Sequence, residues 1–141
     1  TGELVIRSSQ LQATNVEAHE IPSMIDEIPI LAVAAACAEG TTVFEGLSEL
    51  RVKETNRLET IQSELTHMGI AVEIEQDSLI IHGGLIAGGN VNSHGDHRIA
   101  MACAIAALVS ESSTSIEGWE AVSTSYPDFE KDLKYLSGAG I

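Results

Sequence analysis

An internal repeat with a period near 70 residues constrains the fold of this chain more than any other feature. Asp96 lies 70 residues after Asp26, and alanines at 32, 34 and 36 return at 102, 104 and 106. Three shorter echoes accompany them: FEGL and IEGW (44–47, 116–119), ELVIRSS and SLIIHGG (3–9, 78–84), HMGI and GAGI (67–70, 138–141). The repeat predicts two copies of one strand–helix–strand–helix–strand unit with a final strand. We place the first at about 3–77 and an incomplete second at about 78–141.

The first half of the chain reads as alternating strands and helices. We predict a strand at 3–9, a helix at 24–40 that stops at Gly40, and a β-branched strand at 41–47. The helix is apolar on every face over 28–38, which is typical of a helix buried all round. Pro29 fits its first turn, where a missing N–H costs little.

The pattern then predicts an amphipathic helix at 53–69 and a hairpin at 70–84 that turns at 76–77. A glycine-rich stretch at 83–90 lacks the lysine of a phosphate-binding loop and is interpreted as a flexible connection. A last helix should begin within 124–133, with Ser125 as its cap and Pro127 and Asp128 in its first turn.

Composition excludes several classes of function. A formal charge of −14 argues against nucleic acid and anionic membrane surfaces as partners, and an apolar run of 11 residues is too short to span a bilayer. No signal peptide is visible. We expect Cys37 and Cys103, both in alanine-rich runs, to be buried and reduced, as in a cytoplasmic protein. The start at Thr1 suggests an excised segment of something longer.

The few cations of this acidic chain gather in one place. Three of its seven Lys and Arg residues fall within RVKETNRL at 51–58. On the predicted helix Lys53 and Arg57 share one face, and Glu54 approaches Arg57 across a turn. Cations are unfavourable at a helix N-terminus unless an anion binds there as well. An anion site and a solvated basic turn paired with carboxylates both fit this stretch.

A second helix start, GDHRIAMA at 95–102, favours the anion site. It carries Arg98 directly after Asp96 and His97, and Asp96 is also a good N-cap. His94, His97 and Asp96 lack a third neutral ligand, so we expect no metal.

A carboxylate lies in the first turn of the most apolar helix. Asp26 and Glu27 are adjacent there, and one of them is a candidate cap. Partial burial would raise the pKa of either carboxyl and suit it to accept a proton.

Four motifs in this order, MIDEIPILAVAAACAEG, RVKETNRL, GDHRIAMA and SYPDF, resemble the C-terminal part of the 5-enolpyruvylshikimate-3-phosphate synthase family. The resemblance runs from about Leu4 to Leu133. It implies an α/β fold (α+β in some schemes) of repeated βαβαββ units, with mixed sheets outside and buried helices. The whole chain, 1–141, would then be part of the C-terminal domain of an enolpyruvyl transferase.

The resemblance also implies a reaction. The family transfers the enolpyruvyl group of phosphoenolpyruvate to the 5-hydroxyl of shikimate 3-phosphate and releases phosphate, without metal or organic cofactor. Its active site lies in the cleft between two domains. The N-terminal domain, of which this chain shows no sign, supplies further cations and most contacts to shikimate. We therefore expect the isolated segment to bind either substrate weakly and to be inactive.

Matching the motifs residue by residue implies three catalytic roles. Asp26 corresponds to the aspartate that deprotonates the attacking hydroxyl, and it also lies in the substrate site. Lys53 corresponds to the lysine that contacts shikimate 3-phosphate and neutralises charge near the reacting centre. Glu54 corresponds to the glutamate that moves protons to and from the methylene carbon. The residues themselves do not settle which of the three moves which proton.

The same matching implies that Arg57 and Arg98 hold phosphoenolpyruvate, with His97 in support. The chain departs from the family pattern at Thr124, where many members have a lysine. Two other functions stay open: a UDP-N-acetylglucosamine enolpyruvyl transferase, whose usual motifs differ, and a non-catalytic anion-binding module.

Overall fold

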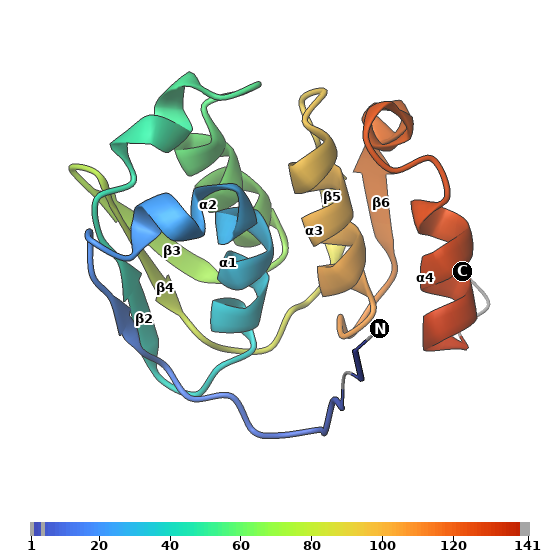
Figure 1. The fold of residues 1–141 in the computed structure, drawn as a ribbon. Coiled ribbons are helices and arrows are strands. Elements are labelled where there is room, and N and C mark those ends of the chain that lie inside the picture. The colour runs from blue at the N-terminus through green and yellow to red at the C-terminus, as the bar shows by residue number, and fades with distance from the viewer. Residues whose placement is uncertain (1, 4, 139–141) are drawn as a thin grey trace.

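The computed structural model of the chain describes residues 2–3 and 5–138. The described residues form two sheets (Figure 1). The larger has the order β1-β2-β4-β3, from β1 (Asn15–Val16), β2 (Thr41–Phe44), β4 (Ser78–His82) and β3 (Ala71–Glu75). The smaller consists of the parallel pair β5 (Gly89–Asn92) and β6 (Thr114–Glu117).

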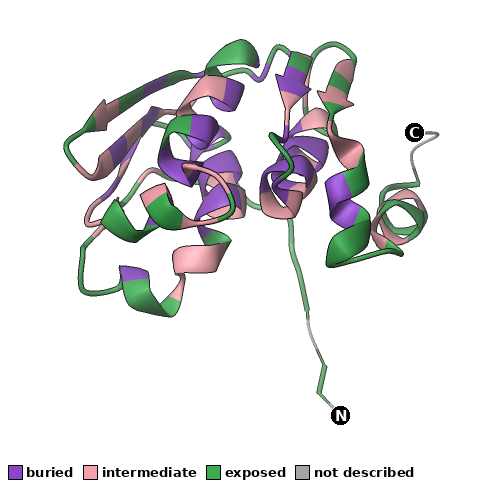
Figure 2. Cartoon of the chain, turned by 90° about the horizontal axis from the view of Figure 1, so that it is seen from above, coloured by how far each residue is buried: buried purple, intermediate pink, exposed green. Residues whose placement is uncertain are grey.

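Three helices pack against one another at the centre: α1 (Ile28–Ala36), α2 (Arg57–His67) and α3 (His97–Ala107). Figure 2 shows buried residues concentrated in these helices and on the inner sides of the strands. A fourth helix, α4 (Phe129–Ser137), lies at the outside and has no buried residue. Short 3₁₀ turns at 21–23, 25–27, 48–52 and 119–124 connect the elements.

The order of strands and helices repeats along the chain, as the internal repeat in the sequence does. The chain runs β1–α1–β2–α2–β3–β4, which is the βαβαββ order that the resemblance implies, and β5–α3–β6–α4 repeats its first four elements. Within each set the first two strands are parallel, as a strand–helix–strand crossover requires. The predicted hairpin is confirmed, with Gln76 in the left-handed region at its turn. Its second strand, β4, lies beside β2 in the first sheet.

The strand predicted at 3–9 is wrong for the described residues of that segment, and Leu4 lies outside them. This arm projects from the body, with Val5 and Ile6 exposed (Figure 2). A strand needs a partner for its ladder of hydrogen bonds. Pairing begins only at the isolated bridge between Gln12 and Glu39, before β1.

The helix predicted at 24–40 is shorter. Pro29 lies in the first turn of α1, as expected, and a 3₁₀ turn precedes it. An α-helix that began at 24 would place Pro29 in its interior, where the ring removes a hydrogen bond. Burial is also less complete than predicted, because Leu31 and Ala34 are half-buried and Cys37 is exposed. Both cysteines are free, and Cys103 is buried.

Two helices begin later than predicted. The α2 helix begins at Arg57 because Asn56 is its N-cap, whose side chain accepts a hydrogen bond from the N–H of Glu59. The α4 helix begins at Phe129, so Ser125 is not its cap. The N–H of Ser125 instead bonds to the Val122 carbonyl and closes the preceding 3₁₀ turn.

Candidate active site

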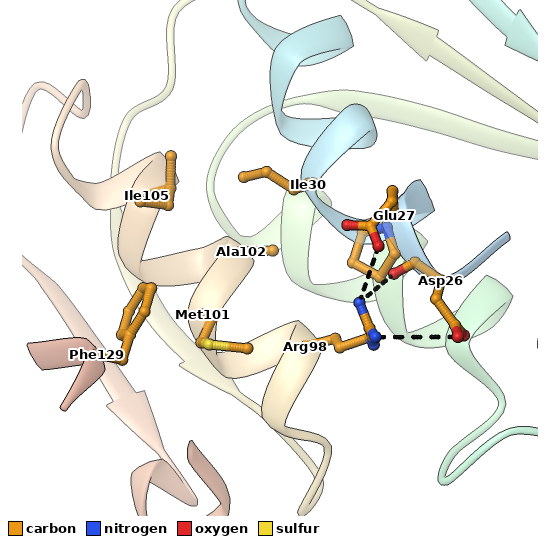
Figure 3. A pocket seen from close by; sticks show the side chains of 9 residues that line it. Asp26, Glu27, Ile30, Arg98, Met101, Ala102, Ile105 and Phe129 are labelled. Atoms are coloured by element: carbon orange, nitrogen blue, oxygen red, sulfur yellow. Dashed lines mark hydrogen bonds and ion pairs between the residues drawn. The ribbon is translucent and has the colours of Figure 1, made fainter. Parts of the chain in front are cut away.

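Asp26 is the point at which three cations from separate segments converge. Its Oδ1 lies 3.1 Å from Arg57 NH1 and 3.5 Å from Lys53 Nζ. Arg98 reaches it from α3, with NH1 donating to the Asp26 carbonyl oxygen at 2.9 Å and NH2 lying 3.9 Å from Oδ2 (Figure 3). The resemblance implies that these three cations and Asp26 belong to one substrate site, and the structure brings the four side chains together.

Arg57 is fully enclosed by carboxylates, and its side chain is only 1% exposed. Its Nε donates to Asp96 Oδ2 at 2.7 Å, while NH2 donates to Glu54 Oε2 at 2.6 Å and to Asp96 Oδ1 at 3.3 Å. The contact with Asp26 uses NH1. Pairing of this kind compensates a buried guanidinium for its lost hydration. An anionic ligand therefore has to displace a carboxylate before it can reach Arg57.

Asp96 joins the starts of α2 and α3. As predicted, it caps α3, because its Oδ1 accepts the N–H of Arg98 at 2.9 Å. It is also completely buried and binds Arg57, the first residue of α2. Sequence reasoning missed this second role. The signal was present in the repeat, because Asp96 is the counterpart of Asp26 and both aspartates bind the same arginine.

Lys53 and Glu54 are not on α2, so the prediction that Lys53 and Arg57 share a helix face is wrong. Lys53 follows a 3₁₀ turn in extended conformation, since α2 begins only after Asn56. Its Nζ lies 2.7 Å from Glu49 Oε1 as well as near Asp26. The predicted approach of Glu54 to Arg57 is confirmed.

Arg98 lies at the rim of a small pocket between α1, α3 and α4. Beyond the guanidinium, which also reaches Glu27 Oε1 at 3.4 Å, the lining is mostly apolar (Figure 3). Met101, Ile105 and Phe129 form much of that lining. The Arg98 side chain is 31% exposed, so it keeps more freedom to meet a ligand than Arg57 does.

Neighbouring cations keep Asp26 ionised. Burial acts to raise the pKa of its carboxyl, but the charges of Lys53, Arg98 and Arg57 outweigh that effect and hold the pKa below 3.8. The sequence expectation of a raised pKa is therefore wrong for Asp26. The side chain is 46% exposed, so its charged oxygens are accessible for accepting a proton.

These residues carry more negative than positive charge. We name this group the Asp26 cluster: Asp26, Glu27, Glu49, Lys53, Glu54, Arg57, Asp96 and Arg98. Its five carboxylates and three cations give a net charge of −2 when all are ionised. The cluster by itself is therefore a poor site for a substrate with several negative charges.

Other candidate residues lie at the margin. His97 is the first residue of α3 and half-buried, and no described hydrogen bond or ion pair joins its ring to the cluster. The Thr124 hydroxyl donates to the Ala121 carbonyl at 2.7 Å. Among residues 2–3 and 5–138, no three His, Cys, Asp or Glu side chains could hold a metal ion, and no helix could cross a bilayer.

Comparison with known proteins identifies a family. Residues 1–133 match the family model described as EPSP synthase (3-phosphoshikimate 1-carboxyvinyltransferase). A 3-phosphoshikimate 1-carboxyvinyltransferase from Herpetosiphon aurantiacus is 53% identical over 91% of this chain, and one from Roseiflexus castenholzii is 50% identical over 96%. The chain spans 30% and 32% of the lengths of these two relatives.

Solved structures agree with that result. An EPSP synthase from Acinetobacter baumannii superposes with a TM-score of 0.86 at 40% identity, over 89% of this chain and 30% of the other. An enolpyruvyl transferase from Streptomyces tendae, with a TM-score of 0.67 and 22% identity over 90% of this chain and 28% of the other, shares the fold. The match over 133 residues and the half-identical relatives together show that this chain belongs to the EPSP synthase (3-phosphoshikimate 1-carboxyvinyltransferase) family.

Proposed function

We propose that this chain forms part of a cytoplasmic 3-phosphoshikimate 1-carboxyvinyltransferase and supplies one wall of its active site. Family membership supports the reaction class. The observation that carries the proposal is the convergence of Lys53, Arg57 and Arg98 on the half-exposed carboxylate of Asp26. Fixed cations suit substrates that carry phosphate and carboxylate groups. The lowered pKa makes Asp26 a weak base before substrate binds, and bound substrate anions, which offset the charges of the neighbouring cations, would raise its pKa and make it a better proton acceptor.

In the proposed reaction Asp26 accepts the proton of the 5-hydroxyl of shikimate 3-phosphate while the oxygen of that hydroxyl bonds to C2 of phosphoenolpyruvate. Lys53 or Glu54 supplies a proton to the methylene carbon. The same side chain, now deprotonated, takes a proton back from the resulting methyl group as the bond between C2 and the phosphate oxygen breaks, which restores the double bond and releases phosphate. Arg98 binds phosphoenolpyruvate, and Arg57 joins it when substrate displaces Glu54; His97 supports the same side. No organic cofactor or metal enters these steps.

The charge of the Asp26 cluster supports a need for the rest of the enzyme. With five carboxylates against three cations in the cluster, further cations must come from elsewhere to hold two anionic substrates. We propose that an N-terminal domain supplies them, and that this chain is a partial C-terminal domain.

Phosphate release tests the proposal. The full-length protein should turn over shikimate 3-phosphate with phosphoenolpyruvate and should be inert with UDP-N-acetylglucosamine in its place. The 141-residue chain should show no turnover with either acceptor. Inactivity of the full-length protein with shikimate 3-phosphate, or brisk turnover by the 141-residue chain alone, would contradict the proposal.

Two variants of the full-length protein distinguish an enzyme from a non-catalytic anion-binding module. Replacing Lys53 by Ala would weaken ligand binding in a module and in an enzyme alike. Asp26→Ala would leave a module's binding nearly intact, whereas an enzyme loses turnover.

A further inference from the structure

A buried carboxylate outside the Asp26 cluster ties α2 to the loop that leads into α3. The Glu64 side chain is only 4% exposed. Its Oε2 accepts the N–H of Asn92 at 2.8 Å and lies 3.5 Å from His67 Nδ1, and its Oε1 lies 3.3 Å from His94 Nε2. Glu64 follows Arg57 by seven residues, so both point from the same face of α2. One helix face therefore holds the β5–α3 connection at two points.

The loop that Glu64 holds is a tight hydrogen-bonded turn. His94 adopts a φ of +52°, an uncommon conformation for a residue other than glycine, which the surroundings have to maintain. Its N–H donates to Asn92 Oδ1 at 2.6 Å, and the Ser93 hydroxyl donates to the Gly118 carbonyl at 2.9 Å. The N–H of Asp96 then bonds to the Ser93 carbonyl, so this turn sets the position of Asp96.

We propose that Glu64 is a positioning residue for phosphoenolpyruvate, an inference that rests on the proposed function. By fixing the loop at 92–95 against α2, it holds Asp96 at the correct distance from Arg57. Because Asp96 also caps α3, the same contact fixes the direction in which Arg98 leaves the first turn of that helix. Glu64 touches no reacting atom and acts through these residues alone.

The electrostatic surroundings of Glu64 keep its carboxylate ionised. The groups that face Glu64 are His67 on α2, His94 on the loop and Cys103 on α3, while Glu117 of β6 lines the same hollow. Burial acts to raise the pKa of Glu64, but hydrogen bonds from Asn92 and its other neighbours outweigh it and hold the pKa below 4.5. At neutral pH the carboxylate is charged and can hold the loop.

The test compares variants of the full-length enzyme in steady-state phosphate release, with separate KM values for the two substrates. Glu64→Ala leaves the Asn92 N–H without its acceptor and frees the loop, so it should raise the KM for phosphoenolpyruvate by about tenfold. The KM for shikimate 3-phosphate should change far less. Glu64→Gln, whose amide oxygen can still accept the Asn92 N–H, should restore most of the loss. His94→Ala, which leaves α2 untouched, should raise the same KM by a smaller factor.

Two controls separate positioning from general stability. Glu59→Gln removes an exposed carboxylate of α2 and should leave both KM values unchanged. Leu65→Ala opens the core beside Glu64, so it should lower the unfolding midpoint without raising the KM for phosphoenolpyruvate. An unchanged KM in Glu64→Ala and His94→Ala, or an equal rise in Leu65→Ala, would overturn the inference while wild type stays active. An inactive wild type would overturn the proposed function and this inference with it.

Discussion

The starts of α2 and α3 look alike in the sequence and differ in the structure. Each has a polar cap followed closely by an arginine. At α2 the arginine is buried: Arg57 is 1% exposed and surrounded by Asp26, Glu54 and Asp96. At α3 the cap is buried instead: Asp96 is enclosed, while Arg98 stays partly open beside a pocket.

The difference assigns distinct tasks to similar residues. Arg57 and Asp96 form a buried pair that fixes the two helix starts relative to each other. Arg98 and Asp26 have side chains that are 31% and 46% exposed, so they can meet a ligand directly, whereas Arg57 can do so only after Glu54 is displaced. Variants at the two helix starts separate these tasks.

Removing the buried arginine should have the largest effect on stability. Arg57→Ala leaves Asp96 buried and without its cationic partner, so the free energy of unfolding should fall by about 3–5 kcal/mol. Arg98→Ala removes a partly exposed cation and should cost about 1 kcal/mol or less. Urea unfolding of the two variants and wild type measures both values. Equal losses in the two variants would contradict the distinction between a buried Arg57 that stabilises the fold and a partly exposed Arg98.

Asp96→Asn isolates the ion pair from the cap. Asparagine caps helices as well as aspartate does, so α3 keeps its start. Loss of a charged partner for Arg57 should lower the free energy of unfolding by about 2 kcal/mol, in the range for hydrogen bonds to charged groups. Asp26→Asn is the matched control at the exposed counterpart. A neutral Asp96→Asn in urea unfolding would show that the cap alone matters.

The cap of α2 should matter less. Asn56→Ala removes the acceptor for the Glu59 N–H, a long contact of 3.4 Å, and should cost about 0.5–1 kcal/mol. Asn56→Asp keeps a good cap and should be near neutral. Unfolding curves of the pair give the difference, and a loss as large as that of Arg57→Ala would argue against separate roles for the cap and the arginine.

The smallest effect is a pH dependence at Asp26. Because its pKa is lower in the folded chain than the ordinary 3.8, its stabilising contribution is complete above that value and is lost as the pH falls through the folded pKa. The difference in unfolding free energy between wild type and Asp26→Asn should therefore shrink below about pH 4. A difference that grows toward acidic pH would contradict a lowered pKa of Asp26 in the folded chain.

Local patterns in the sequence predicted much of this arrangement. The hairpin and the cap of α3 followed from turn and capping residues, and the resemblance implied that Lys53, Arg57 and Arg98 share one site. What the sequence did not show depends on contacts between distant segments. The burial of Arg57 requires Asp96, 39 residues away. The described residues of 3–9 have no pairing partner, and a local pattern cannot show whether a partner strand is present.

In the proposed reaction Asp26 takes a proton while neighbouring cations hold the substrates. Single-turnover phosphate release by full-length wild type and Asp26→Asn, with saturating shikimate 3-phosphate and phosphoenolpyruvate, measures the contribution of Asp26 to the chemical step. The variant should be slower by about 10²–10⁴-fold, as expected for loss of a general base, with shikimate 3-phosphate still bound. A rate close to that of wild type would contradict the claim.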